Sequence, residues 1–251
     1  MISDFPLFMF TTLGGLSAGA YVLSVFFPVK DESKNWKFLL TIGILLAIGL
    51  ICLPFHLTRP QIAFIALMNP SSMMAQEAYW SAGFGIVLLI DFILTKFKNG
   101  SPRGLRIFGA VLATGLMIVM PTAYFAVFTL EAWHSVTTYL LFFLGDIAMG
   151  ALFLALFQTE LMKDAKYLKI ALILAALGTI SFAIEGIYLM TAGESIVPFI
   201  IATVLGAASI AAILAFKKEK LTQQNTIYAM FICMFIAVAI ARYFFYVAGA
   251  I

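Results

Sequence analysis

The sequence predicts an all-α integral membrane protein with eight transmembrane helices. Of its 251 residues, 63% are hydrophobic and 11% are charged, whereas soluble domains are about one quarter charged. The apolar residues form long continuous runs without the alternation that is typical of a membrane β-strand. We therefore expect residues 1–251 to form a single helical domain that lies almost wholly within the lipid bilayer.

Eight apolar runs are each close to the ~20 residues that a helix needs to cross a ~30 Å hydrocarbon core. In chain order they are residues 5–27, 38–55, 78–95, 107–128, 136–157, 167–190, 196–216 and 227–250. The first run has no basic leader or small-residue cleavage pattern and is too long for the core of a signal peptide. We expect it to be retained as the first membrane span.

Basic residues predict the orientation of these spans. All but two of the 15 lysines and arginines lie in the connectors that follow spans one, three, five and seven. Because such residues favour the cytoplasmic side, both termini and the even connectors should lie outside, on the periplasmic side of the cytoplasmic membrane. The two exceptions are Arg59, in the second connector, and Arg242, inside the last span.

The second connector is the longest and contains a short apolar piece of its own. Residues 57–77 include the run 62–68, which is framed by prolines and is too short to span a bilayer. We expect an interfacial or re-entrant segment on the outer side, with Ser71 or Ser72 capping the third spanning helix. His56, Arg59 and Glu77 flank this segment and are candidate functional residues.

Ionisable residues inside membrane spans are expensive and mark candidate sites. Glu185 lies roughly 9 Å and Arg242 roughly 12 Å from the outer ends of their spans, if each residue adds 1.5 Å. These similar depths allow a partly buried ion pair, with either a bracing or a ligand-binding role. We expect Asp146 to point into the bundle and Asp91 to reach cytoplasmic water.

Several other classes of site have no support in the sequence. Cys52 and Cys233 both lie in apolar runs, so neither a disulfide framework nor a cysteine-rich metal motif is present. The two histidines are His56 and His134, and the latter is expected in an exposed outer loop. We therefore expect no haem or iron-sulfur cluster in this chain, and nothing indicates nucleic-acid binding.

Three stretches resemble the membrane anchor subunit of dimethyl sulfoxide reductase. They are the opening FPLFMFT at residues 5–11, the segment HLTRP at residues 56–60 followed by Glu77 and Ser81, and the ending ARYFFY at residues 241–246. The same group includes the polysulfide and nitrite reductase anchors. The resemblance also implies eight spans with both termini outside.

The resemblance implies a function in anaerobic respiration. Such anchors oxidise menaquinol and hold a four-cluster iron-sulfur subunit and a molybdopterin catalytic subunit on the membrane. The family's quinol-site histidine, acidic residue and C-terminal arginine match His56, Glu77 and Arg242. Arg59, Glu185 and Tyr246 complete the candidate quinol-binding set. Imidazole and carboxylate groups suit this chemistry because they can accept the protons that a quinol releases.

Two rival interpretations stay open at this stage. One is a small secondary transporter that uses Glu185, Arg242 and Asp146, although the sequence shows no clear internal repeat and its polar groups gather toward one face. The other is a purely structural anchor without a quinol site. Whether the anchor oxidises quinol or is purely structural, the terminal electron acceptor is chosen by the catalytic subunit.

Overall fold

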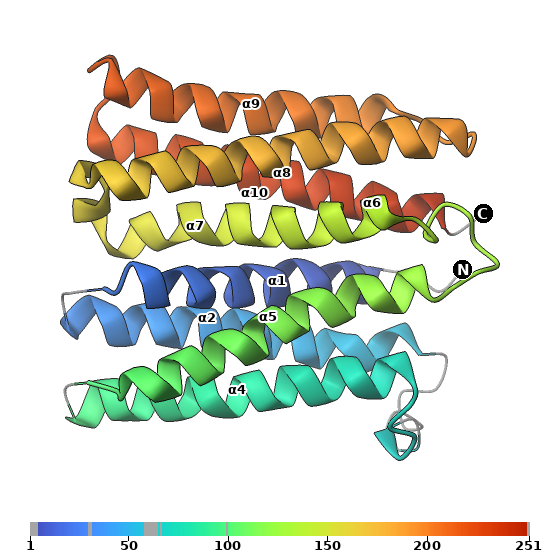
Figure 1. Cartoon of the computed structure of the whole chain (residues 1–251), viewed down its shortest axis with the longest axis horizontal. Coiled ribbons are helices and arrows are strands. Elements are labelled where there is room, and N and C mark those ends of the chain that lie inside the picture. Colours follow the sequence, from blue (N-terminus) through green and yellow to red (C-terminus); the bar gives the residue numbers. More distant parts are fainter. Residues whose placement is uncertain (1–4, 30–31, 58–64, 66, 99, 250–251) are drawn as a thin grey trace.

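A computed structural model describes residues 5–29, 32–57, 65, 67–98 and 100–249, and the regular secondary structure within these ranges is helical. Eight helical segments are long and apolar enough to cross a membrane, which confirms the expected spans. Figure 1 shows them running side by side. They are α1 (Phe5–Phe26), α2 (Glu32–Cys52), α4 (Met73–Lys98), α5 (Arg103–Phe125), the composite span Val136–Phe157, α8 (Ala165–Thr191), α9 (Val197–Lys217) and α10 (Gln223–Ala248).

The composite span contains a change in helical geometry. It begins as α6 (Val136–Tyr139), continues as the π-helical turn η3 (Leu140–Leu144) and ends as α7 (Gly145–Phe157). A π-helical turn widens the helix and displaces backbone carbonyls from the regular pattern, and such turns often occur at functional sites. This turn ends two residues before Asp146.

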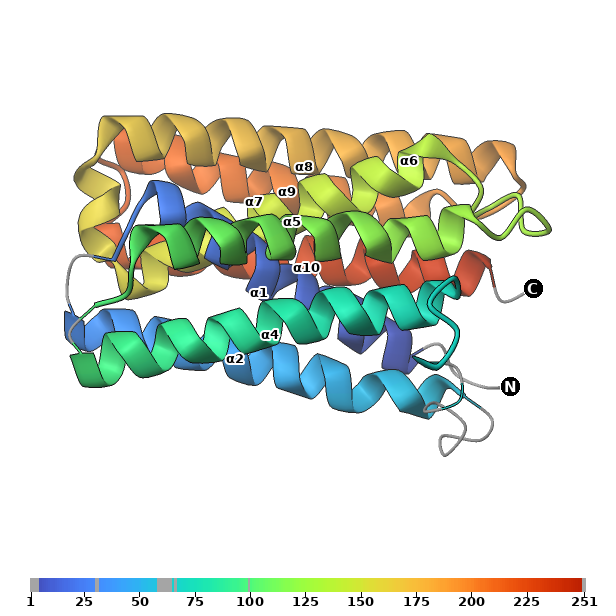
Figure 2. The ribbon, with the colours of Figure 1, turned by 60° about the horizontal axis from the view of Figure 1, so that its bottom comes forward.

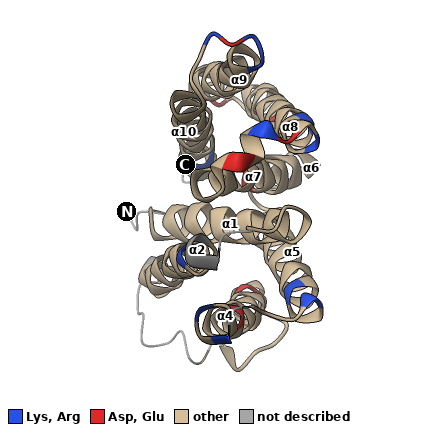
Figure 3. Ribbon diagram, turned by 90° about the vertical axis from the view of Figure 1, so that its left-hand side faces the viewer, with Lys and Arg blue, Asp and Glu red and all other residues tan. Residues whose placement is uncertain are grey.

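The helices form two groups of four that follow the chain order. The first group contains α1, α2, α4 and α5, and the second contains the composite span with α8, α9 and α10. Figure 3 shows the two groups end-on, with α1 and α7 packed against each other between them. The chain therefore folds as two groups of four consecutive spans, although the sequence shows no clear internal repeat.

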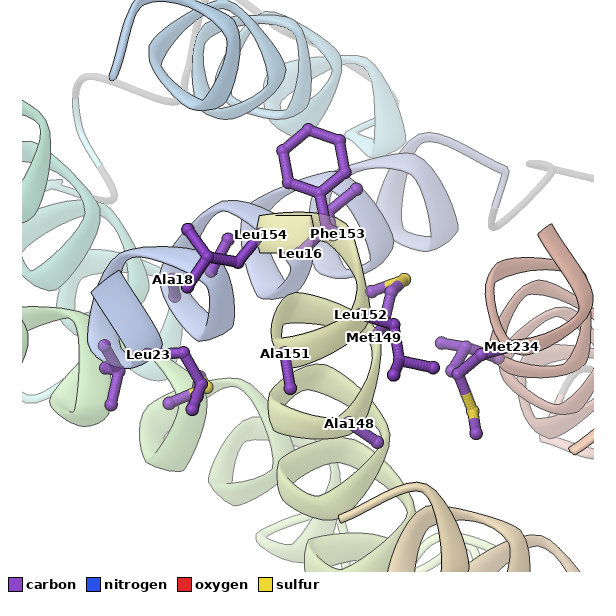
Figure 4. Packing of buried hydrophobic residues seen from close by; sticks show 14 of the residues in the cluster. Leu16, Ala18, Leu23, Ala148, Met149, Ala151, Leu152, Phe153, Leu154 and Met234 are labelled. Carbon is purple, nitrogen blue, oxygen red and sulfur yellow. The ribbon is translucent and has the colours of Figure 1, made fainter. Parts of the chain in front are cut away.

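Glycine residues allow α1 and α7 to approach closely. A Cβ atom at Gly19 would overlap the backbone of Asp146, and one at Gly150 would overlap the backbone of Gly19 and Ala20. Figure 4 shows the buried side chains that pack around this contact. Gly15 and Gly19 are four residues apart on α1 and form a small-x-x-x-small motif, which allows two helices to pack closely.

The surface of the helix bundle suits a lipid environment. Large apolar side chains on the outward faces of α4, α5, α8 and α9 are exposed in the isolated chain, including Ile86, Val111, Ile180 and Val204. By contrast, α1 is buried over most of its length. The bundle therefore has a dense interior and an apolar exterior, as a multi-pass membrane protein requires.

Both chain ends lie at the same end of the bundle, which we call the termini-side end (Figure 1). Lysines and arginines gather at the opposite end, which faces the viewer in Figure 3. By the positive-inside rule we expect the termini-side end to face outward. The periplasmic location of the termini stays a prediction.

Part of the second connector lies outside the described residues. Its expected interfacial or re-entrant segment includes residues 58–64 and 66, which are not described. The end of the connector is described, and there the Ser72 hydroxyl accepts a hydrogen bond from the Ala75 N–H at 3.1 Å. This contact confirms that Ser72 caps α4. Figure 2 shows α4 leaving this connector beside the end of α2.

Candidate functional site

Arg242 is almost completely buried in α10, with a relative exposure of 1%. Its Nη2 atom lies 2.8 Å from Oδ1 of Asp146 on α7. Its Nη1 donates to the Thr11 carbonyl at 2.5 Å, and Nη2 also donates to the Phe142 carbonyl at 3.3 Å. The guanidinium carbon is 4.3 Å from the centre of the Phe142 ring. Arg242 thus joins three helical segments that are distant in sequence.

The acidic partner of Arg242 is Asp146, so the predicted pairing with Glu185 is wrong. Glu185 and Arg242 were paired because their depths in the membrane are similar, but depth does not specify which helices are neighbours. Asp146 does point into the bundle, as predicted, and it is fully buried. Its carboxylate touches Arg242 but has no hydrogen bond of normal geometry, and a Cβ atom at Gly15 would occupy its position.

A row of three buried hydroxyl groups begins beside this ion pair. The Thr11 and Tyr246 hydroxyls lie 2.9 Å apart, and the Tyr246 hydroxyl donates to that of Tyr124 at 2.9 Å. The row crosses α1, α10 and α5. The Trp133 ring packs against the rings of Tyr124 and Tyr246 and donates its indole N–H to the Phe245 carbonyl.

Glu77 lies in the second turn of α4 and is 4% exposed. Its carboxylate interacts electrostatically with the hydroxyls of Tyr124 and Tyr246. Its Oε1 atom has no hydrogen-bond partner among the described residues, and the same is true of the Ser81 hydroxyl. Because these residues are four apart, they lie on one face of α4. We call Thr11, Glu77, Tyr124, Asp146, Arg242 and Tyr246 the buried polar cluster.

Of His56 and Arg59, the structure describes only the His56 backbone. His56 ends the short 3₁₀ turn η1 (Leu53–His56), whose backbone packs against α1. The His56 side chain and all of Arg59 lie outside the described residues. The start of α4 and the end of α2 nevertheless meet at the same end of the bundle, as Figure 2 shows. The predicted role of His56 therefore stays a prediction.

Glu185 occupies a separate position in the second helix group. It is fully buried on α8 and lies beside Thr137 and Tyr188. Neither carboxylate oxygen has a hydrogen bond of normal geometry among the described residues. No contact within that part of the chain joins Glu185 to Arg242. Of the six predicted quinol-site residues, the structure brings together Glu77, Arg242 and Tyr246.

Asp91 does not reach water, contrary to the prediction. It is 1% exposed and accepts hydrogen bonds from the hydroxyls of Tyr21 and Thr95 at 2.9 and 3.1 Å. Arg106 lies 3.3 Å from the same carboxylate, across the short connector between α4 and α5. Four polar groups thus satisfy one another near the lysine-rich end, where they join α1, α4 and α5.

His134 is half-buried, so its expected exposure in a loop is also wrong. Its ring contacts those of Phe125 and Phe128, and its Nδ1 lies 2.5 Å from the Phe125 carbonyl. These contacts fasten the connector that carries Trp133 over the buried polar cluster.

Sequence reasoning missed Tyr124 and Thr11 as members of the cluster. Tyr124 lies near the end of an apolar span, where tyrosine most often belongs to the interfacial aromatic belt. Thr11 lies in the opening motif, but its hydroxyl could as well bond to its own helix, and it does approach the Leu7 carbonyl at 2.9 Å. Neither residue carries a charge that would have drawn attention.

Comparison with known protein families gives one result that covers most of the chain. The model of the DMSO reductase anchor subunit family (DmsC) matches residues 1–196. None of the curated proteins that were compared matches the chain. The family match includes Thr11, Glu77, Tyr124 and Asp146, whereas Arg242 and Tyr246 lie beyond it and join the cluster through the fold. Because the match extends over well more than half of the sequence, the chain belongs to the DMSO reductase anchor subunit family.

Proposed function

We propose that this anchor subunit oxidises menaquinol at the termini-side end of α4 and passes the electrons to its iron-sulfur partner. Membership of the family makes the chain the membrane anchor of a molybdoenzyme complex, in association with the catalytic and iron-sulfur subunits of DMSO reductase. The proposal adds the electron donor, the place of its oxidation and the four-cluster type of iron-sulfur subunit.

The observation that carries the proposal is the pair of unsatisfied polar atoms on α4. Oε1 of Glu77 and the hydroxyl of Ser81 are buried without partners among the described residues. Buried polar groups are normally hydrogen-bonded, and exceptions often mark a missing ligand. A quinol head group carries hydroxyls that can donate to one atom and accept from the other. The residues present therefore fit such a ligand.

When bound, a quinol supplies two electrons and two protons to the site. Glu77 is proposed to accept a proton because its Oε1 atom has no hydrogen-bond partner among the described residues. His56 is proposed as the second acceptor, since imidazole serves this role near neutral pH. Arg59 is proposed to attract the head group, and the electrons leave through the iron-sulfur subunit.

Arg242 and Tyr246 are proposed to act as positioning residues. Arg242 is committed to Asp146 and two backbone carbonyls, so its contacts fix α10 against α1 and η3. Tyr246 holds Thr11 and Tyr124 in place through its hydroxyl group. Glu185, which lies apart from these groups, is the next candidate if the α4 site fails.

A secondary transporter is the weaker proposal. Its expected residues do not form one pathway, because Arg242 is paired with Asp146 and Glu185 lies beside Thr137 in another part of the bundle. Uptake of a substrate by proteoliposomes that contain this chain alone would favour transport. Retention of the iron-sulfur and molybdenum subunits during purification is expected for the anchor.

The proposed function is tested with the complete complex carrying His56→Ala or Glu77→Gln. Quinol-dependent reduction of dimethyl sulfoxide should fall by about 10²–10⁴-fold, the usual contribution of a general acid or base. Reduction driven by an artificial dye should stay within about twofold of the wild-type rate. Dyes deliver electrons directly to the partner subunits, so the loss of a proton acceptor at the quinol site does not affect them.

Glu131→Gln is the matched control, since Glu131 is exposed in the connector at the same end of the bundle. It should retain both activities. Wild-type quinol-dependent rates in both the His56 and the Glu77 variants would refute the proposed site. Equal loss of quinol-dependent and dye-dependent activity would instead identify an assembly defect and count against a specific quinol role.

A further inference from the structure

A groove of about 290 Å³ lies on the lipid-facing surface of the bundle, between α2 and α4. Figure 2 shows these two helices side by side, and they are in direct contact. The buried side chains of Leu46 and Leu88 form the floor of the groove, whereas Ile44 and Leu89 are exposed at its edges. The groove therefore opens toward the lipid, and we call it the α2–α4 groove.

The lining of the α2–α4 groove is wholly apolar among the described residues. By contrast, the groove between α1 and α5 includes the charged side chain of Arg103, and the one between α8 and α9 includes Thr203. A polar head group would find no hydrogen-bond partner in the α2–α4 groove, and burying it there would be costly. The groove suits a hydrocarbon chain.

One stripe of α4 connects the groove to the proposed quinol site. At intervals of four, three and four residues, the stripe contains Ser81, Gly85, Leu88 and Phe92. Residues at this spacing share one face of a helix. Since each residue adds 1.5 Å, Gly85 is about 6 Å further along α4 than Ser81. The groove thus begins one helical turn beyond Ser81, on the side away from the termini-side end.

The other wall of the groove leads to the same end of the bundle. Gly43, Leu46 and Leu50 line it at intervals of three and four residues on α2. Beyond Leu50 the chain continues into η1, whose last residue is His56. The two segments that carry the proposed proton acceptors, His56 and Glu77, are therefore continuous with the two walls of the groove.

Two glycines give the groove its depth. A Cβ atom at Gly43 would lie 3.8 Å from Cδ2 of Leu88, and one at Gly85 would lie 3.5 Å from Cδ2 of Leu46. These are ordinary van der Waals distances, so a methyl group fits at either position, whereas a longer side chain would occupy the groove. The same recesses can accept methyl branches, which distinguish an isoprenoid chain from the straight acyl chain of a phospholipid.

We propose that the α2–α4 groove holds the isoprenoid tail of the menaquinol whose head group binds beside Glu77 and Ser81. This inference rests on the proposed quinol function and adds the path of the tail. From Leu39 to Leu50 the groove extends over roughly 17 Å, at 1.5 Å per residue. It therefore holds the part of the tail nearest the ring, and the remainder lies in the lipid.

The groove acts by aligning the tail. Lipid is as apolar as the groove, so the tail gains little hydrophobic free energy by leaving the bilayer, and close packing is the main favourable contribution. An aligned tail fixes the direction from which the head group enters the site. A side chain that fills the groove should therefore weaken the binding of tailed quinols by steric overlap and leave the binding of a tail-less ring unchanged.

Photo-crosslinking can locate the tail in the complete wild-type complex. The probe is a menaquinone with a diazirine on the second isoprene unit from the ring. We expect it to label residues 39–50 of α2 and 85–92 of α4. An excess of the same naphthoquinone ring without a tail should suppress this labelling, because displacement of the head group releases the tail into the lipid. Added phospholipid should not compete.

Gly43→Leu and Gly85→Leu test the groove by filling it. Each should raise the KM for tailed menaquinol by about fivefold or more, because overpacking opposes binding of the tail. The KM for the tail-less naphthoquinol and both kcat values should stay within about twofold, since only ground-state binding of the tail is affected. Gly85→Ala should have a smaller effect, and dye-dependent turnover should not change in any of these variants.

Ala183→Leu is the matched control, because Ala183 lines the groove between α8 and α9. It should change neither KM nor the labelling. A rise in KM in this variant would show a general effect of added bulk on the lipid-facing surface. An equal rise in KM for tailed and tail-less quinols in the glycine variants would show a distorted head-group site. Either result would overturn the proposed path of the tail.

Labelling along α1 and α5, or labelling that the tail-less ring does not suppress, would also overturn it. The first result would place the tail in the other groove, and the second would leave it dissolved in the bilayer. If His56→Ala and Glu77→Gln still abolish quinol-dependent activity in those cases, the proposed function stands and only the path of the tail fails. If those two variants are fully active, the proposed function fails as well.

Discussion

Replacement of Arg242 by leucine should strongly destabilise the bundle. The change removes the 2.8 Å contact with Asp146 and the hydrogen bonds to the carbonyls of Thr11 and Phe142. Removing one member of a buried ion pair typically costs about 3–5 kcal/mol, because the other charge stays buried without a partner. We expect a loss of that size in the free energy of unfolding.

Arg106→Leu provides the comparison. The Arg106 side chain is 17% exposed, and its partner Asp91 keeps the hydrogen bonds from Tyr21 and Thr95 after the change. The expected loss is about 1.5–3 kcal/mol, as for one hydrogen bond to a charged group. Arg242→Leu should therefore be the more damaging variant.

Titration with sodium dodecyl sulfate in mixed micelles can measure both free energies. A second test adds Asp146→Asn to Arg242→Leu, which removes the uncompensated charge. The double variant should recover at least about 1 kcal/mol relative to Arg242→Leu alone, because a double-mutant cycle reports the coupling of the pair. Equal losses for Arg242→Leu and Arg106→Leu, or no recovery in the double variant, would refute this reasoning.

Two further predictions concern packing and topology. Gly15→Ala should cost about 1–3 kcal/mol in the free energy of unfolding by overpacking, since its Cβ would overlap the Asp146 carboxylate. Gly43→Ala should be tolerated, because its Cβ would meet Leu88 at 3.8 Å. Equal thermal stability of the two variants would contradict this prediction. A cysteine at Gln224 should be labelled only from the cytoplasm and one at Ser195 only from the periplasm, and the reverse pattern would overturn the predicted orientation.

The sequence was sufficient to predict the spans because hydropathy acts along a single chain. A helix in lipid must satisfy its own backbone hydrogen bonds, so a run of about 20 apolar residues has few alternatives. The cap at Ser72 and the close approach at Gly15 and Gly19 were predictable for the same reason, since each depends on a local pattern.

Contacts between helices were much harder to predict. The depth of Arg242 suggested an acidic partner, but Glu185 and Asp146 both satisfied that criterion, and the choice depends on which helix lies beside α10. Asp91 was expected to reach water because it lies near the lysine-rich end of its span. Its burial could not be foreseen, because it depends on a contact with Tyr21, 70 residues earlier in the chain. Tyr124 could not be distinguished from an interfacial aromatic until its contact with Tyr246 was visible.

The most direct test of the quinol site is photoaffinity labelling of the complete complex with an azido-quinone. The proposal predicts that the label attaches to the start of α4, within the peptide that contains Glu77 and Ser81, and that excess menaquinol prevents the labelling. The Glu77→Gln variant should show reduced labelling, whereas Glu131→Gln should not. Labelling confined to the region of Glu185 and Thr137, and competed by menaquinol there, would contradict the proposed site.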